Sequence, residues 1–232
     1  MPASYFDVDG TLLTTNLLHP TVFYLLNQQN PLKSLGRLAR AAAKGPQMAL
    51  AEMRDRRLFN ELLFTVYEGM SQDRLHCLAD EAFDVVIKRS LFPHAKNLIQ
   101  TCIDQGHEVV LVSGALDFLM KRLAEHLGAH DIIANRLEIK DQYATGRLLR
   151  PIVAGPEKAR LIRDHARAKG HDLDDCFAYS DSYSDVPMLS VVGHPAAVNP
   201  DARLTRLANA YGWPIVQLGN DRPARRPWEL FA

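Results

Sequence analysis

The chain has 232 residues, with 27 Lys and Arg against 27 Asp and Glu, so its formal net charge of zero gives no overall field that would favour a nucleic-acid partner. Its three cysteines, Cys77, Cys102 and Cys176, are odd in number and form no C-x-x-C pair. This argues against a disulfide framework or a cysteine zinc site and favours a reduced, cytoplasmic compartment. No signal-peptide pattern opens the chain, and the longest apolar runs fall short of the roughly 20 residues that span a bilayer.

The first part of the chain predicts one strand followed by helices. Residues 3–8 read as a buried strand. From about Thr14 to Ser90 the apolar residues recur at helical spacing, with a break at Gly45-Pro46 and Ser71 as the expected N-cap of a last helix to about Lys88. No part of this stretch alternates like a strand. It predicts an insertion of three or four helices.

The rest of the chain alternates between helices and strands, which predicts an α/β protein with a Rossmann-like parallel sheet. The expected helices cover about 94–105, 115–127, 156–169 and 184–191, and the expected strands cover 109–113, 132 onward, 176–179, 196–198 and 215–216, with a hairpin whose turn contains Gly146. We therefore expect an α/β core made of residues 1–13 and 91–219, an all-helical cap at 14–90, and a polar, Arg-rich tail at 220–232.

Two carboxylates stand at the end of the first predicted strand. Asp7 and Asp9 are one residue apart and are followed by Gly10 and Thr11. Residues i and i+2 of a strand point the same way, so their charges would repel each other unless a cation or a shared proton relieved them. A strand end that ligates a hard cation such as Mg²⁺ explains this spacing. A solvated surface turn explains it equally well when the stretch is taken alone.

Further polar groups follow later strands of the predicted sheet. Ser113 and Gly114 follow the second strand, and Asp181 and Asp185 follow the strand that begins at Cys176. Lys158 lies near the start of the helix at 156–169. In an open parallel sheet, ligands bind beyond the carboxyl ends of the strands, so these groups predict a joint site for a cation and a phosphate.

These stretches, in this order, resemble the four motifs of the haloacid dehalogenase-like (HAD) hydrolase superfamily. They are Asp7-Val8-Asp9-Gly10-Thr11, Ser113-Gly114, Lys158, and Asp181 with Asp185. The helical insertion after the first motif is similar to the helical C1 cap of the phosphoserine-phosphatase-like subfamily IB. The resemblance covers essentially the whole chain.

The resemblance implies a phosphatase and gives each motif residue a role. Asp7 is the expected nucleophile that forms an aspartyl-phosphate, and Asp9 is the expected general acid and base. Mg²⁺ is the expected cofactor, with Asp7, Asp9, Asp181 and Asp185 as the expected metal-binding residues. Ser113, Gly114, Lys158 and Thr11 are expected to bind the phosphate.

The resemblance leaves the substrate open. Asn16 stands where phosphoserine phosphatases carry a glutamate, and Ser180 through Asp185 differs from their Gly-Asp-Gly-x-Asn-Asp motif. Both differences weigh against L-phosphoserine itself. We expect a small phosphorylated metabolite, phosphoserine-like or other, and no nucleic acid. The oligomeric state is not predicted.

Residues 32–60 carry a net charge of +5, which allows two interpretations. One is an amphipathic face that makes weak contact with anionic membranes and admits a lipid phosphate. The other, which we favour, is a solvated helix face with one or two arginines that grip a second anionic group of the substrate. Two further alternatives are a phosphotransferase on the same fold and a non-catalytic phosphate-binding module. Thr14–Asn16 and Ser90–Pro93 are the expected hinges of a cap that opens and closes.

Overall fold

A computed structural model describes residues 1–15, 18–26, 45, 47–48, 51 and 55–219 of the chain. A seven-stranded sheet forms its centre. The strand order is β4-β3-β2-β1-β5-β6-β7, and every neighbouring pair is parallel except β3 and β4. This confirms the predicted α/β architecture. The strands are β1 (Ala3–Asp7), β2 (Glu108–Leu116), β3 (Asp131–Lys140), β4 (Tyr143–Leu149), β5 (Phe177–Ser180), β6 (His194–Val198) and β7 (Ile215–Val216).

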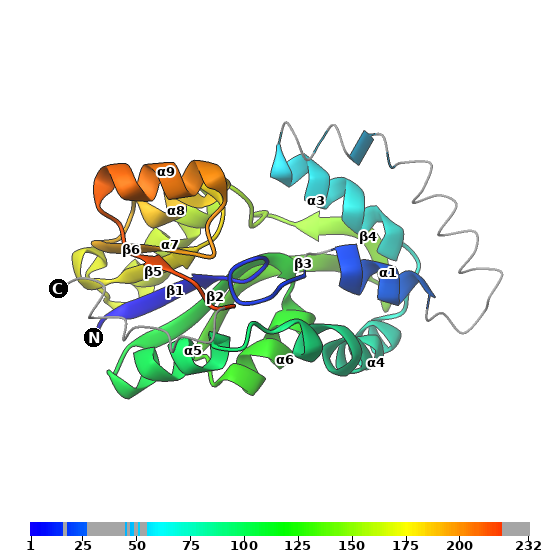
Figure 1. Cartoon of the computed structure of the whole chain (residues 1–232). Coiled ribbons are helices and arrows are strands. Elements are labelled where there is room, and N and C mark those ends of the chain that lie inside the picture. Colours follow the sequence, from blue (N-terminus) through cyan, green and yellow to red (C-terminus); the bar gives the residue numbers. More distant parts are fainter. Residues whose placement is uncertain (16–17, 27–44, 46, 49–50, 52–54, 220–232) are drawn as a thin grey trace.

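Helices cover both faces of the sheet, with α5 and α6 on one face and α7, α8 and α9 on the other (Figure 1). The described α-helices are α1 (Leu18–Leu26), α3 (Arg56–Phe64), α4 (Gln72–Ala82), α5 (Ala95–Asp104), α6 (Asp117–Leu127), α7 (Pro156–Lys169), α8 (Val186–Leu189) and α9 (Ala202–Tyr211). Short 3₁₀ or π turns lie at Thr65–Tyr67, Phe83–Ile87, Lys88–Ser90, Leu173–Asp175 and Tyr183–Asp185.

The alternation of side chains along β1 divides the core into two layers. Phe6 belongs to the cluster under α5 and α6, where its ring stacks on Tyr179 with centroids 4.2 Å apart. Tyr5 belongs to the cluster under α7, α8 and α9. Since Asp7 is two residues after Tyr5, its side chain is directed to the α7 side of the sheet. The strand period therefore decides which helix the first carboxylate meets.

The described helices between β1 and α5 share the core of the sheet. Tyr24 of α1, Phe64 of α3 and Leu75 of α4 are buried in the same cluster as Phe6. Ser71 caps α4 as predicted, since its hydroxyl accepts a hydrogen bond from the Arg74 amide at 3.4 Å. These helices therefore reach the core of the sheet, while Phe59 and Leu63 of α3 form a separate small cluster with Met48 and Ala51.

The two chain segments that lead into and out of the insertion lie side by side. The amide of Thr14 donates to the Ser90 carbonyl at 2.7 Å, and Leu13 and Leu91 form an isolated antiparallel bridge. This pairing coincides with the two predicted hinge segments, of which Asn16 lies outside the described residues. A motion of the inserted helices relative to the sheet would bend the chain at these two paired segments.

The β3–β4 hairpin differs from the sequence prediction. Its turn is formed by Asp141 and Gln142, which both have positive φ, rather than by Gly146. Gly146 lies inside β4, where an added Cβ would come within 3.1–3.3 Å of Thr65 and Glu68. Polar residues such as Asp141 tolerate the left-handed region, so the sequence did favour a turn at this position. The prediction chose Gly146 instead because glycine is the more usual turn residue. The glycine instead permits β4 to pack closely on the inserted helical segment.

Other boundaries also depart from expectation. Strand β2 continues through Leu116 instead of ending at Ser113, and the helix expected at about 184–191 is a 3₁₀ turn followed by the single turn of α8. Helix α9 was not predicted, although Asp201 caps it through the amides of Arg203 and Leu204. Residues 32–44 of the basic cap segment and the tail 220–232 lie outside the described residues. None of the helices that the structure describes has the length and apolar character needed to cross a bilayer.

Candidate active site

The first carboxylate, Asp7, stands at the end of the central strand. Strand β1 lies between β2 and β5, so the chain continues in opposite directions along the sheet on its two sides. Such a switch point leaves a crevice at the carboxyl edge, which is where α/β proteins bind their ligands. Asp7 itself is 5% exposed and pairs with Val112 of β2.

A tight turn after Asp9 makes room for a second carboxylate. Gly10 has a φ of +83°, and a Cβ at this position would collide with the Asp181 carboxyl group, whose Cγ would lie only 2.7 Å away. Only glycine combines this backbone conformation with so close an approach. The glycine of the first motif therefore gives Asp181, 171 positions later in the chain, its place beside β1.

Thr11 joins the two carboxylates. Its buried hydroxyl lies 3.0 Å from Asp7 Oδ2 and 3.1 Å from Asp181 Oδ1, and it accepts the Asp181 amide at 3.0 Å. The single hydroxyl proton can serve one carboxylate at a time, so the two acids share a donor. In the structure Thr11 orients both acids, and its expected contact with phosphate stays a prediction.

Lys158 connects the third and fourth motifs to the first. Its buried Nζ lies 2.5 Å from Asp7 Oδ1 and 2.8 Å from Asp185 Oδ2. Burial by itself lowers the pKa of Lys158, but Asp185 and Asp7 more than offset it and raise the pKa above its usual range. Ser180 donates to the same Oδ2 atom of Asp185 at 2.9 Å. A permanent positive charge is thus fixed against Asp7.

Asp9 and Asp181 have strongly altered acidities. Burial, followed by the charge of Asp7, raises the pKa of Asp9 to about 7. The same two causes, in the same order, raise the pKa of Asp181 to about 7. Crowding by Asp7 was the predicted source for Asp9, and the structure adds burial as the larger one. A carboxyl group that titrates near neutrality can both donate and accept a proton at physiological pH.

An arginine of the inserted segment reaches this edge of the sheet. Arg56, the first residue of α3, donates from Nη1 to the Ser184 hydroxyl at 3.2 Å, and its charge lowers the pKa of Asp9 against the larger effect of burial. In the sequence, Arg56 is one of seven basic residues between 32 and 60. No local pattern distinguishes it from Arg54 and Arg57, because the contact depends on how α3 docks.

The Ser113–Gly114 stretch lies in β2, one residue beyond the partner of Asp7. The Ser113 hydroxyl oxygen accepts the Ala115 amide at 3.0 Å, and its own proton has no acceptor among the described residues. Asn135 was missed as a site residue. Its side chain donates to the Gly114 carbonyl at 2.7 Å and accepts the Val153 amide at 2.8 Å, so it ties the second motif to the loop that leads into α7.

The donors at this edge are suited to a hard cation. Asp7 and Asp181 offer carboxylate oxygens on either side of the Thr11 hydroxyl, and buried Asp185 Oδ1 has no hydrogen-bond partner among the described residues. All-oxygen ligands are those that Mg²⁺ prefers, and a divalent charge would relieve the crowding that raises the pKa of Asp181. Asp7, Asp9, Asp181 and Asp185 all stay predictions as metal-binding residues. Asp185 is already held by Lys158 and Ser180.

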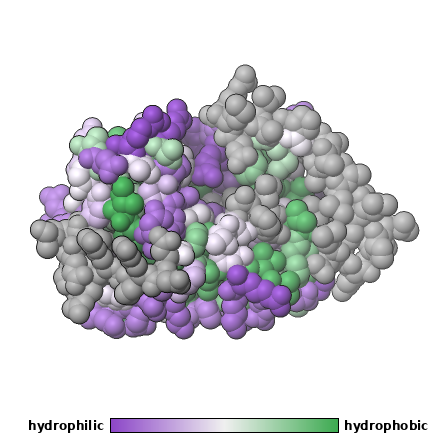
Figure 2. Space-filling view, in the orientation of Figure 1, coloured by the Kyte–Doolittle hydropathy of each residue, from purple (hydrophilic) through white to green (hydrophobic). Residues whose placement is uncertain are grey.

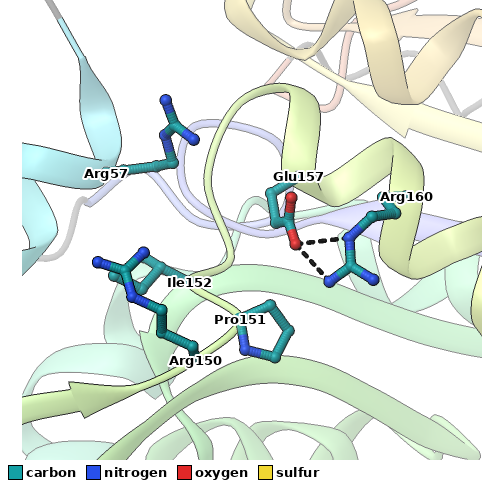
Figure 3. A pocket seen from close by; sticks show the side chains of 6 residues that line it. All are labelled: Arg57, Arg150, Pro151, Ile152, Glu157 and Arg160. Atoms are coloured by element: carbon teal, nitrogen blue, oxygen red, sulfur yellow. Dashed lines mark hydrogen bonds and ion pairs between the residues drawn. The ribbon is translucent and has the colours of Figure 1, made fainter.

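A polar cleft of about 400 Å³ lies between α3, the end of β4 and α7. Figure 3 shows Arg57 on one side of it, Arg150 and Pro151 on another, and Arg160 joined to Glu157 across from them. Figure 2 shows hydrophilic surface in the recess between the α7–α9 side and the α3 side of the molecule. Each guanidinium already has a carboxylate partner: Arg57 with Asp55, Arg150 with Glu61, and Arg160 with Glu157 and Asp164. The cleft is charged but locally balanced.

Comparison with known proteins agrees with this geometry. Residues 5–190 match the family described as haloacid dehalogenase-like hydrolase, a range that includes every motif residue discussed above. The chain belongs to this family.

Individual relatives place the chain within the phosphoserine-phosphatase-like part of the family. It is 33% identical over 225 residues to a protein of Mycobacterium tuberculosis named phosphoserine phosphatase SerB1, covering 97% of this chain and 73% of that one. A crystal structure of a Bordetella pertussis protein of unknown function superimposes with a TM-score of 0.80 at 25% identity, covering 94% of this chain and 98% of that one. The expected enzyme class, a phosphatase, is confirmed at this level.

A substrate-bound phosphoserine phosphatase supports the fold alone. It superimposes with a TM-score of 0.65 at 18% identity, covering 94% of this chain and 93% of that one.

Proposed function

We propose that this HAD-family hydrolase is a Mg²⁺-dependent phosphomonoesterase that acts through an aspartyl-phosphate on Asp7. The observation that carries the proposal is the contact of Lys158 with both Asp7 and Asp185, which joins three motifs from distant parts of the chain at one edge of the sheet. A decayed or purely structural site has no need for a buried lysine shared between two buried acids.

In the proposed reaction the Asp7 carboxylate attacks phosphorus in line with the ester oxygen. The bond between phosphorus and that oxygen breaks, and Asp9 transfers its proton to the leaving alkoxide. Asp9, now ionised, takes a proton from a water molecule, whose oxygen attacks phosphorus and breaks the bond to Asp7. Inorganic phosphate leaves and both acids return to their starting states. A pKa of about 7 suits Asp9 to both steps.

The residues around Asp7 are proposed to bind the phosphoryl group. Lys158 and the Ser113 hydroxyl are proposed to neutralise and bind the oxygens on which charge accumulates in the loose transition state. A bound metal ion would neutralise charge on the phosphoryl oxygens, so that the anionic nucleophile could approach phosphorus. Asp7 and Asp181, oriented by Thr11, are proposed to hold it.

The substrate proposed here is a small phosphate ester with a second anionic group. Arg56, the first residue of α3, contacts Ser184 in the short turn after β5. Its guanidinium therefore lies at the border between the inserted helices and the sheet. A guanidinium binds a carboxylate or a second phosphate through two parallel hydrogen bonds. The favoured interpretation of the basic segment thus has a specific candidate residue.

Turnover of p-nitrophenyl phosphate with Mg²⁺ tests the central assignment. We expect Asp7→Asn and Asp7→Ala to lower kcat/KM by on the order of 10³-fold or more, because removal of a nucleophile abolishes the covalent path. Asp84→Asn removes an exposed carboxylate from the segment after α4 and is the matched control, with expected activity equal to that of the unmodified protein. Undiminished turnover in the folded Asp7 variants would refute the proposal.

A panel of phosphorylated metabolites tests the substrate. It includes phosphoserine, phosphorylated hydroxy acids, sugar phosphates, nucleotides and lysophospholipids. We expect Arg56→Ala to raise KM for esters with a second anionic group by about tenfold or more and to leave p-nitrophenyl phosphate nearly unaffected, since one charge-assisted pair contributes about 1.5–3 kcal/mol. Equal losses for both kinds of substrate would assign Arg56 to the phosphoryl group instead.

The same assay separates hydrolysis from phosphotransfer. Phosphate released in water, measured with and without an added alcohol, gives the fraction of the aspartyl-phosphate that reacts with water. Release that requires the alcohol would favour a phosphotransferase on this fold.

A further inference from the structure

A second group of side chains that could hold a metal ion lies at the opposite edge of the sheet from Asp7. Glu108 and Asp131 are the first residues of the neighbouring parallel strands β2 and β3, and His165 comes from α7. Their ligand atoms all lie within 4.8 Å of one another, and they are the only three such residues found together in the part of the chain that the structure describes. The four aspartates of the candidate active site do not make such a group.

Helix α7 connects the two edges. Lys158, Ile162, His165 and Lys169 follow at intervals of three or four residues and so share one side of the helix. Lys158 at the start meets the carboxylates beyond β1, while His165 and Lys169 near the end meet those at the start of β2 and β3. The second group is therefore separated from the first by the length of the helix.

The Nε2 atom of His165 faces both acids of this group. The His165 side chain is 11% exposed, and its buried Nε2 lies 3.5 Å from Asp131 Oδ2 and 3.8 Å from Glu108 Oε1. Its other nitrogen, Nδ1, lies 3.1 Å from the Tyr5 hydroxyl. Histidines that bind metals use one nitrogen for the ion and engage the other in such a bond.

A second histidine lies beside this group. His171 Nδ1 lies 2.7 Å from the Met1 carbonyl, which can only accept, so this nitrogen donates. Its Nε2 lies 3.0 Å from Glu108 Oε2, so His171 is within reach of the same carboxylate.

Lys169 now supplies the positive charge between the two acids. Its Nζ lies 3.1 Å from Glu108 Oε1 and 3.3 Å from Asp131 Oδ2, while its side chain is 44% exposed. A half-exposed lysine loses little by turning into water, because solvent-exposed ion pairs contribute little to stability. It can therefore give up its place to a more strongly bound ion.

We propose that Glu108, Asp131 and His165 form a second metal site, distinct from the catalytic one, which takes a divalent transition-metal ion of the Zn²⁺ class in place of the Lys169 ammonium group. Nitrogen and carboxylate donors suit Zn²⁺, Co²⁺ or Ni²⁺ better than Mg²⁺, which prefers oxygen alone. His171 lies close enough to Glu108 to provide a further ligand. Such an ion would fasten the end of α7 to the starts of β2 and β3.

Titration of the purified chain with Zn²⁺, in millimolar Mg²⁺ that saturates the oxygen-donor site, tests the proposal. Calorimetry should give one site per chain, and Co²⁺ should give the visible absorption of a nitrogen- and oxygen-ligated ion. We expect His165→Gln and Glu108→Gln to weaken Zn²⁺ binding more than tenfold. Lys169→Met should strengthen it, because the ion no longer displaces a cation. Arg167→Met, which removes an exposed charge from the same helix, should leave it unchanged.

The gain in Lys169→Met cannot be produced by misfolding, so the test survives a loss of stability in the other variants. Zn²⁺ binding that is equal in the unmodified protein and His165→Gln would overturn the proposal. So would binding that disappears in Asp181→Asn, since the ion would then occupy the catalytic site. These readouts use no enzymatic activity and remain decisive if the proposed phosphatase mechanism is wrong.

Discussion

The Nζ atom of Lys158 lies 2.5 Å from Oδ1 of Asp7, inside a protein layer in which both side chains are less than a tenth exposed. The nucleophile proposed above therefore rests against a fixed cation before any substrate arrives. This one contact links α7 to the end of β1, and it makes the ionisation of Asp7 depend on a residue 151 positions later in the chain.

Replacement of Lys158 should affect both activity and stability. Lys158→Met leaves Asp7 and Asp185 as buried like charges without their shared partner, and the loss of one member of a buried ion pair costs about 3–5 kcal/mol. We expect a lower midpoint of urea unfolding and a fall in kcat on p-nitrophenyl phosphate of at least 10²-fold, in line with the loss of a transition-state hydrogen-bond donor.

Two variants accompany this measurement. Arg167→Met removes a surface charge from the same helix and should change neither property. In Lys158→Met with Asp185→Asn, one of the two unpaired charges is gone, so stability should recover in part while activity stays low. Full activity in the double variant would show that Lys158 serves the fold alone.

The role proposed for Asp9 predicts a dependence on the leaving group. Asp9→Asn cannot protonate a departing alkoxide, so turnover of an alkyl phosphate should fall by about 10²–10⁴-fold. p-Nitrophenolate leaves without a proton, and the loss in its formation should be much smaller. Parallel assays of both esters give the ratio. Equal losses for the two would remove the general-acid role.

The acidities of Asp9 and Asp181 predict how stability varies with pH. Both pKa values rise from 3.8 to about 7 on folding. Between about pH 4 and pH 7 the folded chain holds protons that the unfolded chain has released, so these groups lower the free energy of unfolding as the pH rises through this window. The two together should cost on the order of 2 kcal/mol at pH 8 after allowance for solvent screening.

Urea unfolding from pH 5 to pH 8, with EDTA and with Mg²⁺, measures this effect. Mg²⁺ should stabilise the protein more at pH 8 than at pH 5, because at low pH protons compete with the ion. Asp181→Asn should flatten the metal-free profile relative to the unmodified chain, and this comparison cancels the other titrating groups. A metal-free stability that rises in parallel in both proteins would contradict the assigned acidities.

Gly10 offers a test of the close approach between the first and fourth motifs. Gly10→Ala places a methyl group against the Asp181 carboxyl group and also strains a φ of +83°. Gly106→Ala imposes a similar strain, at a φ of +78°, where an added Cβ meets nothing within 4 Å. Strain alone should cost both variants about 1–2 kcal/mol. We expect Gly10→Ala to lose more stability and more Mg²⁺ affinity than Gly106→Ala, and the difference measures the contact with Asp181. Equal losses in the two variants would contradict this close approach.

The position of Asp7 at the end of its strand and that of Lys158 near the start of its helix followed from local patterns, whereas Ser113 lies inside β2 rather than at its end. The apolar strand before Asp7, the apolar run before Ser113 and the helix beginning near Lys158 are encoded within about ten residues each, and parallel strands bring their carboxyl ends to one edge. The alternation from Tyr5 to Asp7 even fixes which side of the sheet the carboxylate faces. These features depend on near neighbours, so residue spacing was enough to predict them.

Other features required the folded chain. The turn at Asp141 and Gln142, the docking of Arg56 beside Ser184 and the bridge that Asn135 forms between Gly114 and Val153 all depend on which distant segments pack together. The group of Glu108, Asp131 and His165 has no spacing pattern, because its members come from two strands and a helix. The sequence by itself determined the α/β class and the acids that follow β1 and β5. Only the tertiary structure decided their acidities and partners, because burial and long-range contacts set both.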